Sequence, residues 1–208
     1  MQPMIRMWLR LRRSAHDFSG DRSGLAAVEF AMIVPLVLVL FFGTVEFSSG
    51  VAVDRKVTLM ARTLSDLTSQ NISITDPQLT NIFSASTAIM TPYPAAPTRT
   101  TLSEIYVDSN NVAKIQWSKA ATIANGATQA TLTTSNRSPG DNVTSLVPPA
   151  LLVKQTYLIF SEVSYLYKPT IGYVMGKAGI NLSDFTYTRP RQSTCVTYHG
   201  APAGCPTP

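Results

Sequence analysis

The sequence predicts an α+β protein in which one long N-terminal helix crosses a membrane and continues into a small domain with an antiparallel sheet. Three patterns support this fold class. Residues 25–47 are apolar on every face of a helix. Residues 48–69 repeat apolar side chains at steps of three and four, the period of a helix. Residues 101–118 alternate at steps of two, and residues 151–167 form an apolar run rich in strand-forming side chains.

The positive charge is concentrated at the N-terminus. The chain has 208 residues and a net charge of +5, and residues 1–24 contain five arginines against two aspartates. The remaining residues carry 12 basic and 10 acidic side chains, so no basic face for nucleic acid is indicated. Arginines next to an apolar segment predict instead that residues 1–24 are a basic cytoplasmic leader and that the bulk of the chain lies across the membrane.

Residues 25–47, LAAVEFAMIVPLVLVLFFGTVEF, are long enough for a single transmembrane helix. At about 1.5 Å per residue they rise roughly 35 Å, and a hydrocarbon core is about 30 Å thick. Two other interpretations stay open. One is the buried helix of a soluble domain. The other is a secretory signal cleaved near Ser48-Ser49-Gly50, although the apolar region of such a signal is usually about 7–15 residues long.

Glu29 is unexpected in this segment, because a carboxylate at the centre of a membrane helix costs about 2.5–3.5 kcal/mol. One interpretation is that Glu29 reaches the cytoplasmic headgroups, since it lies only one helical turn beyond Leu25. The other uses Gly24, because Glu29 is the fifth residue after that glycine. Cleavage between Gly24 and Leu25 would create an ammonium group that Glu29 of the same or a neighbouring subunit can neutralise. Gly20 is less suitable, because its fifth following residue is Leu25.

A basic leader, a glycine and an apolar run with glutamate at its fifth position resemble the processing site of type IV prepilins. The wider pattern is similar to the TadE-like family, the minor pilins or pseudopilins of the tight-adherence (Tad, or Flp) pilus apparatus. The segments that carry this resemblance are Ala26-Ala27-Val28-Glu29-Phe30-Ala31, Pro35-Leu36, Phe42-Gly43 and Glu46-Phe47, with weaker similarity at Glu162-Val163-Ser164-Tyr165, Tyr167, Pro169 and Arg189-Pro190-Arg191.

The resemblance implies a pilin-like, single-pass protein of a bacterial inner membrane, with a periplasmic C-terminal domain that is incorporated into a pilus. The implied function is that of a minor structural subunit in the assembly of a Tad-type pilus for adhesion or secretion. The implied partners are other pilin or pseudopilin subunits, a prepilin peptidase, and the Tad secretion platform and motor. Some family members are cleaved and others keep their N-termini. The alternative function is therefore an unprocessed, membrane-anchored periplasmic binding or adhesion protein.

Residues 48–69 are expected to extend the membrane helix. One apolar stripe recurs at helical spacing there and is expected to pack on the domain formed by residues 70–208. This lollipop arrangement is used by pilins. The stripe consists of Val53, Val57, Met60, Leu64 and Leu67.

Within the domain, Thr75-Asp76-Pro77 predicts the start of a short helix that ends near Met90, followed by a linker over residues 91–97. Strands are predicted at 101–108 and 112–118, joined at Asn110-Asn111. Their alternation places Ile105 and Val107 opposite Glu104 and Asp108, and places Ile115 and Trp117 on one face opposite Lys114 and Gln116.

Residues 119–145 lack a period and are interpreted as a short helix followed by an exposed loop around Ser138-Pro139-Gly140-Asp141. Residues 151–167 carry apolar groups on both faces and predict a central strand. Residues 180–188 are expected to add an edge strand.

Cys195 and Cys205 are expected to pair in an oxidising periplasm and to close a loop with nine residues between them. Closing such a loop stabilises the fold by about 2–3 kcal/mol. A redox or metal pair is the alternative, but the spacing is not C-x-x-C, and His16 and His199 are the only histidines. No catalytic motif or phosphate loop is recognised, so we expect a protein that is not an enzyme and has no cofactor.

Overall fold

The computed structural model of the protein describes residues 23–169, 179–198 and 205. The chain forms two compact units, Met1–Glu46 and Phe47–Pro208. Its fold is α+β, as the sequence predicts. The long helix α2 (Ser23–Ser69) is followed by a small domain with a five-stranded antiparallel sheet.

In the first unit, α2 exposes apolar side chains in every direction. Leu25 and Phe30 are each 69% exposed, and Met32 is 75% exposed. Within the described part of the chain, α2 is the one helix long and apolar enough to cross a membrane. A soluble core helix buries such side chains, so the exposed surface fits a single-pass anchor and argues against the buried-helix interpretation.

In the second unit, the remainder of α2 packs on one face of the sheet. Val53, Val57, Met60 and Leu64 of the expected stripe are completely buried. Their sheet partners come from three neighbouring strands, and the hydroxyl of Ser161 donates a hydrogen bond of 2.7 Å to the carbonyl of Ala61. The residues that complete this core from the sheet include Leu102, Trp117, Ile159 and Val163. We call this side of the sheet the helix face, and the opposite side the distal face.

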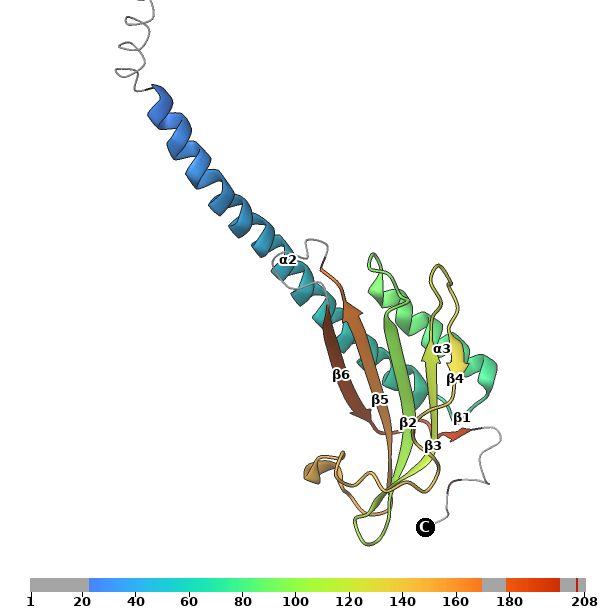
Figure 1. Cartoon of the computed structure of the whole chain (residues 1–208). Helices are drawn as coiled ribbons and strands as arrows, with labels where there is room; N and C mark the ends of the chain where they lie inside the picture. The colour runs from blue at the N-terminus through green and yellow to red at the C-terminus, as the bar shows by residue number, and fades with distance from the viewer. Residues whose placement is uncertain (1–22, 170–178, 199–204, 206–208) are drawn as a thin grey trace, which may run out of the picture. The chain divides into compact units, whose positions relative to one another are not determined.

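The five strands lie side by side in the order β4-β3-β2-β5-β6 (Figure 1). The predicted hairpin, the interior strand and the edge strand are all present, with ends shifted by a few residues. The strands are β2 (Thr98–Val107), β3 (Ala113–Thr122), β4 (Thr131–Thr133), β5 (Thr156–Tyr167) and β6 (Ile180–Thr188).

The predicted short helix is also present, as α3 (Asp76–Thr87) followed by a 3-10 turn, η1 (Ala88–Met90). The Gln78 side chain accepts the Thr75 backbone N–H at 2.9 Å, which satisfies one donor at the helix entry. Leu79 and Phe83 bury the apolar side of α3 in the core beneath α2.

Two predictions for the middle of the chain are wrong: the short helix within residues 119–145 and the start of the central strand at residue 151. No helix forms within residues 119–145, all of which the structure describes; β3 continues to Thr122, and β4 pairs with it further along. The Ala- and Thr-rich residues at the end of β3 form a strand because β2 provides a backbone partner along the whole length of β3. The next strand begins at Thr156 and not at residue 151, because Pro149–Leu151 form the 3-10 turn η2.

The prediction that Ile115 and Trp117 share one face of the sheet is also wrong. Glu104 pairs with Trp117 while Ile105 pairs with Ile115, so Gln116 is an extra residue in β3. Such a β-bulge reverses the alternation. Trp117 therefore joins the core on the helix face, and Ile115 joins a second core on the distal face.

The second core lies under the segment that connects β4 to β5. Val143 and Val147 of this segment pack on Ile105, Ile115 and Phe160. The Tyr187 hydroxyl also donates to the carbonyl of Leu146 at 2.7 Å. This connection covers one half of the distal face and leaves the other half open.

Candidate processing and assembly site

The described part of α2 begins at Ser23, and its first turn contains the sequence-predicted processing site, Gly24 and Leu25. Both residues lie at the N-terminal side of the exposed apolar segment.

Nothing in the described fold requires glycine at position 24. A methyl group placed there would have no neighbouring atom within 4 Å. Glycine costs about 1 kcal/mol relative to alanine inside a helix. Its presence is therefore unfavourable for the helix and is not explained by close packing or by backbone geometry in this part of the chain.

Glu29 lies one turn after Leu25 on the same side of α2, because residues four apart are neighbours on a helix surface. Its side chain is exposed, as are those of Val28 and Phe30 on either side. The structure brings Leu25 and Glu29 within one turn of each other. A new ammonium group on Leu25 would therefore be within reach of the Glu29 carboxylate.

The structure also reveals a buried carboxylate, Glu104, which the predicted alternation places on the strand face opposite Ile105 and Val107. Glu104 is only 2% exposed and lies on the helix face. Its Oε1 accepts the backbone N–H of Val196 at 2.5 Å, and its Oε2 accepts the indole N–H of Trp117 at 3.1 Å. The same indole N–H lies 2.7 Å from the Val196 carbonyl oxygen. Burial raises the pKa of Glu104 to about 8, although the hydrogen bonds from Val196 and then Trp117 oppose the shift.

These contacts hold the C-terminal segment against the sheet. Strand β7 (Thr197–Tyr198) follows Val196 and pairs in parallel with β1 (Ser73–Ile74). The Tyr198 hydroxyl donates to the Asp76 carboxylate at the start of α3. A disulfide joins Cys195 to Cys205, with their Cα atoms 5.8 Å apart. The sequence predicts the cysteine pair. It does not predict the contacts of Glu104, because Trp117 and Val196 lie on other segments of the chain and no local pattern links them to Glu104.

Metal chemistry has no candidate in the described residues, where no group of three or more His, Cys, Asp or Glu side chains is arranged to hold an ion. The charged groups that come together, Arg137 with Glu162, Arg191 with Asp66 and Lys114 with Asp108, bind each other, and the Glu104 carboxyl accepts the indole N–H of Trp117. They act as internal contacts of the domain.

Residues 24–64 match the family model described as TadE-like protein. The match confirms the resemblance in the sequence and covers Gly24, Glu29, the apolar segment and the buried stripe of α2 as far as Leu64. The TadE-like family is a structural family associated with Tad pili. No curated protein and no solved structure matches the chain.

Proposed function

We propose that this chain, which carries a TadE-like domain at residues 24–64, is a minor pilin-like subunit in the assembly of a Tad-type pilus. The observation that carries the proposal is the order Gly24, Leu25, Glu29 at the N-terminal side of an apolar segment of α2 whose side chains are exposed on all sides. In a bacterial inner membrane, with residues 1–24 cytoplasmic and residues 70–208 periplasmic, lipid covers this surface. In an assembled pilus, neighbouring pilin or pseudopilin helices cover it.

In this proposal, a prepilin peptidase cleaves after Gly24. The Leu25 ammonium and the Glu29 carboxylate then form a pair within or between subunits. A charge pair removed from water is stable only when each charge has its partner. Glu29 therefore favours a subunit that has been cleaved and is aligned with its neighbour, and the Tad platform and motor act on such subunits.

Processing can be tested by intact-mass analysis of the protein isolated from its native host. We expect a chain that begins at Leu25, and we expect Gly24→Leu to keep Met1 as its first residue. Gly20→Leu is the control and is expected to be cleaved normally. A wild-type chain that begins at Met1 would support the unprocessed binding or adhesion protein. A chain that begins near Gly50 would support a secretory signal and contradict the pilin proposal.

Assembly can be tested with Glu29→Leu, scored by membrane fractionation and by electron microscopy of pili. We expect the variant to remain in the membrane, because leucine suits the apolar segment better than glutamate, and we expect pili to be lost. Thr44→Leu is the matched control, because among the described residues the Thr44 hydroxyl donates only to the Leu40 carbonyl of its own helix, at 2.8 Å. Normal piliation of the Glu29 variant would remove this carboxylate from assembly.

A further inference from the structure

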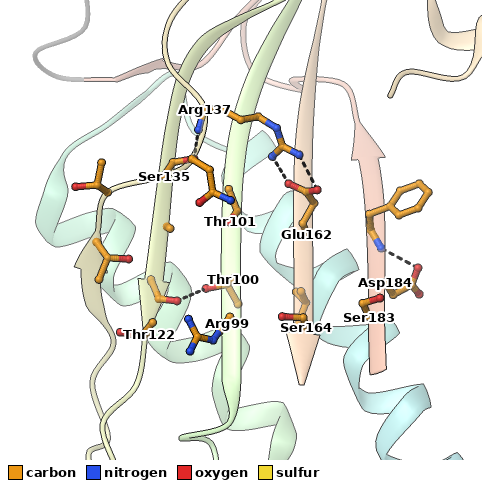
Figure 2. Close-up of a pocket in the computed structure, with 17 residues that line it drawn as sticks. Arg99, Thr100, Thr101, Thr122, Ser135, Arg137, Glu162, Ser164, Ser183 and Asp184 are labelled. Carbon is orange, nitrogen blue, oxygen red and sulfur yellow. Dashed lines mark hydrogen bonds and ion pairs between the residues drawn. The ribbon is translucent and has the colours of Figure 1, made fainter. Parts of the chain in front are cut away.

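The open half of the distal face forms a polar cavity of about 440 Å³. It lies beside the second core and is bounded by β6 and by the segment that follows β4 (Figure 2). The cavity is formed by the sheet itself, so its floor is as rigid as the strand pairing. None of its lining residues belongs to residues 24–64.

Two rows of side chains run across the sheet at this cavity, because strand pairing places them in register. In the first row, Arg99 pairs with Thr122 of β3 and with Ser164 of β5, and Ser164 pairs with Ser183 of β6. Four strands span roughly 14 Å at about 4.8 Å per strand. The first row therefore presents one guanidinium among three hydroxyls along a line that can follow an extended ligand.

In the second row, Thr101 pairs with Glu162, and Glu162 pairs with Phe185. Glu162 forms a two-pronged ion pair with Arg137, whose guanidinium lies 5.1 Å from the centre of the Phe160 ring. These contacts hold Arg137 in place and neutralise both charges. Phe185 is 57% exposed and presents an aromatic ring at this end of the row.

Arg99 differs from Arg137, because no described carboxylate forms an ion pair with it. Within the described part of the chain, the hydroxyls of Thr101, Thr122, Ser164 and Ser183 also have no hydrogen-bond partner. A guanidinium binds a carboxylate with two parallel hydrogen bonds. The cavity therefore combines one available cation, several available hydroxyls and an exposed aromatic ring. Its lining also includes the Asp184 carboxylate of β6, which accepts the backbone N–H of Phe185 at 2.8 Å.

We propose that this cavity binds a carboxylated saccharide, with the carboxylate on Arg99, the sugar hydroxyls on the Thr and Ser side chains, and the apolar face of a ring against Phe185. A mainly apolar ligand would leave the guanidinium and the hydroxyls without partners, which is costly. A nucleic acid would need several cations for its phosphates. Arg99 is the single lining cation without an ion pair among the described residues.

The test is calorimetric titration of the purified full chain with a hexamer of galacturonic acid. The control ligand is the methyl ester of the same hexamer, which keeps the ring and its hydroxyls and removes the charge. We expect the acid to bind, and the ester to bind at least about tenfold more weakly because the charge-assisted bonds are lost. Raising the salt concentration should weaken binding of the acid more than binding of the ester.

Arg99→Ala and Phe185→Ala are each expected to weaken binding of the acid at least about tenfold. Arg55→Ala is the matched control and should bind as the wild type does, because Arg55 is an exposed arginine on α2 outside the cavity. Failure of the hexamer to bind, equal binding of acid and ester, or equal losses in Arg55→Ala and Arg99→Ala would overturn the proposal. Equally tight binding of a hexaglutamate peptide would assign the cavity to acidic peptides and overturn it as well.

Discussion

Replacement of Glu104 by glutamine is expected to change how the stability of the domain depends on pH. The carboxyl is buried, and burial raises its pKa to about 8. In the unfolded chain the pKa of a glutamate is about 4.3. Between these values the folded chain holds a proton that the unfolded chain has lost. The free energy of unfolding therefore decreases as the pH rises through this range and is greatest, for this group, below the unfolded pKa.

The size of the effect follows from the difference between the two pKa values. Each pKa unit corresponds to about 1.4 kcal/mol. The free energy of unfolding therefore falls by roughly 5 kcal/mol as the pH rises from the unfolded to the folded pKa. Between pH 5 and pH 7 the change is roughly 3 kcal/mol, mostly unaffected by solvent screening because Glu104 is 2% exposed. Glutamine has nearly the same shape and does not titrate, so the difference between wild type and Glu104→Gln isolates this contribution.

Urea unfolding of the full chain at several pH values measures this difference. Trp117 reports on the site, because it contacts Glu104 directly and is the only tryptophan left in a Trp8→Phe background. Glu162→Gln is the control background, because Glu162 pairs with Arg137 on the distal face, and the difference between wild type and Glu104→Gln should be the same in this background. A constant difference between wild type and Glu104→Gln from pH 5 to pH 8 would refute a protonated buried carboxyl at this site.

Three other changes test the packing of the domain, each by the urea midpoint. Leu64→Ala is expected to lower the free energy of unfolding by about 2–5 kcal/mol, because Leu64 is completely buried. The control Leu59→Ala, on the exposed side of α2, should lower it by less than about 0.5 kcal/mol. Equal losses would contradict the packing of α2 on the sheet. Joint replacement of Cys195 and Cys205 by serine should cost about 2–3 kcal/mol, and an unchanged midpoint would contradict the disulfide as a stabilising contact. Arg137→Ala should cost no more than about 1 kcal/mol, because the ion pair with Glu162 is partly exposed, and a larger loss would mean that Arg137 stabilises more than this pair.

The elements that the sequence predicts well are those whose pattern is local and long. The stripe from Val53 to Leu64 repeats for several turns, and the alternation around Ile105 and Val107 continues over a whole strand. By contrast, β1 and β7 have two residues each, and no period is visible in so short a segment. Their pairing depends on where the C-terminal segment is held, which the residues themselves do not show.

The bulge at Gln116 explains why the assignment of faces failed. Alternation predicts faces only while each residue of one strand meets one residue of its neighbour. The extra residue in β3 reverses the order, so Ile115 and Trp117 lie on opposite faces. The same region contains Glu104, a carboxylate that is only 2% exposed. Its burial is compensated by the N–H groups of Val196 and Trp117, which are 92 and 13 residues away in the chain.

The two candidate sites differ in the same way. Gly24, Leu25 and Glu29 fall within six residues, so their relation follows from the sequence and from the pitch of a helix. Arg99, Ser164 and Ser183 come from three strands and become neighbours only through the register of β2, β5 and β6. Serine and threonine in isolated strands indicate no more than a solvated face, so the cavity could not be inferred before the pairing was known.

The separation of these sites along the chain makes the two proposed functions independently testable. Residues 24–64 include Glu29 and none of the saccharide-binding residues proposed here. Arg99→Ala should therefore weaken sugar binding at least about tenfold and leave pili intact, and Glu29→Leu should abolish pili while the purified chain still binds the acidic hexamer. The stripe around Leu64 is the part of α2 that both functions need, because it supports the sheet on which the cavity is built. A loss of both functions is thus expected only for changes that unfold this shared core, and such a change will also lower the urea midpoint.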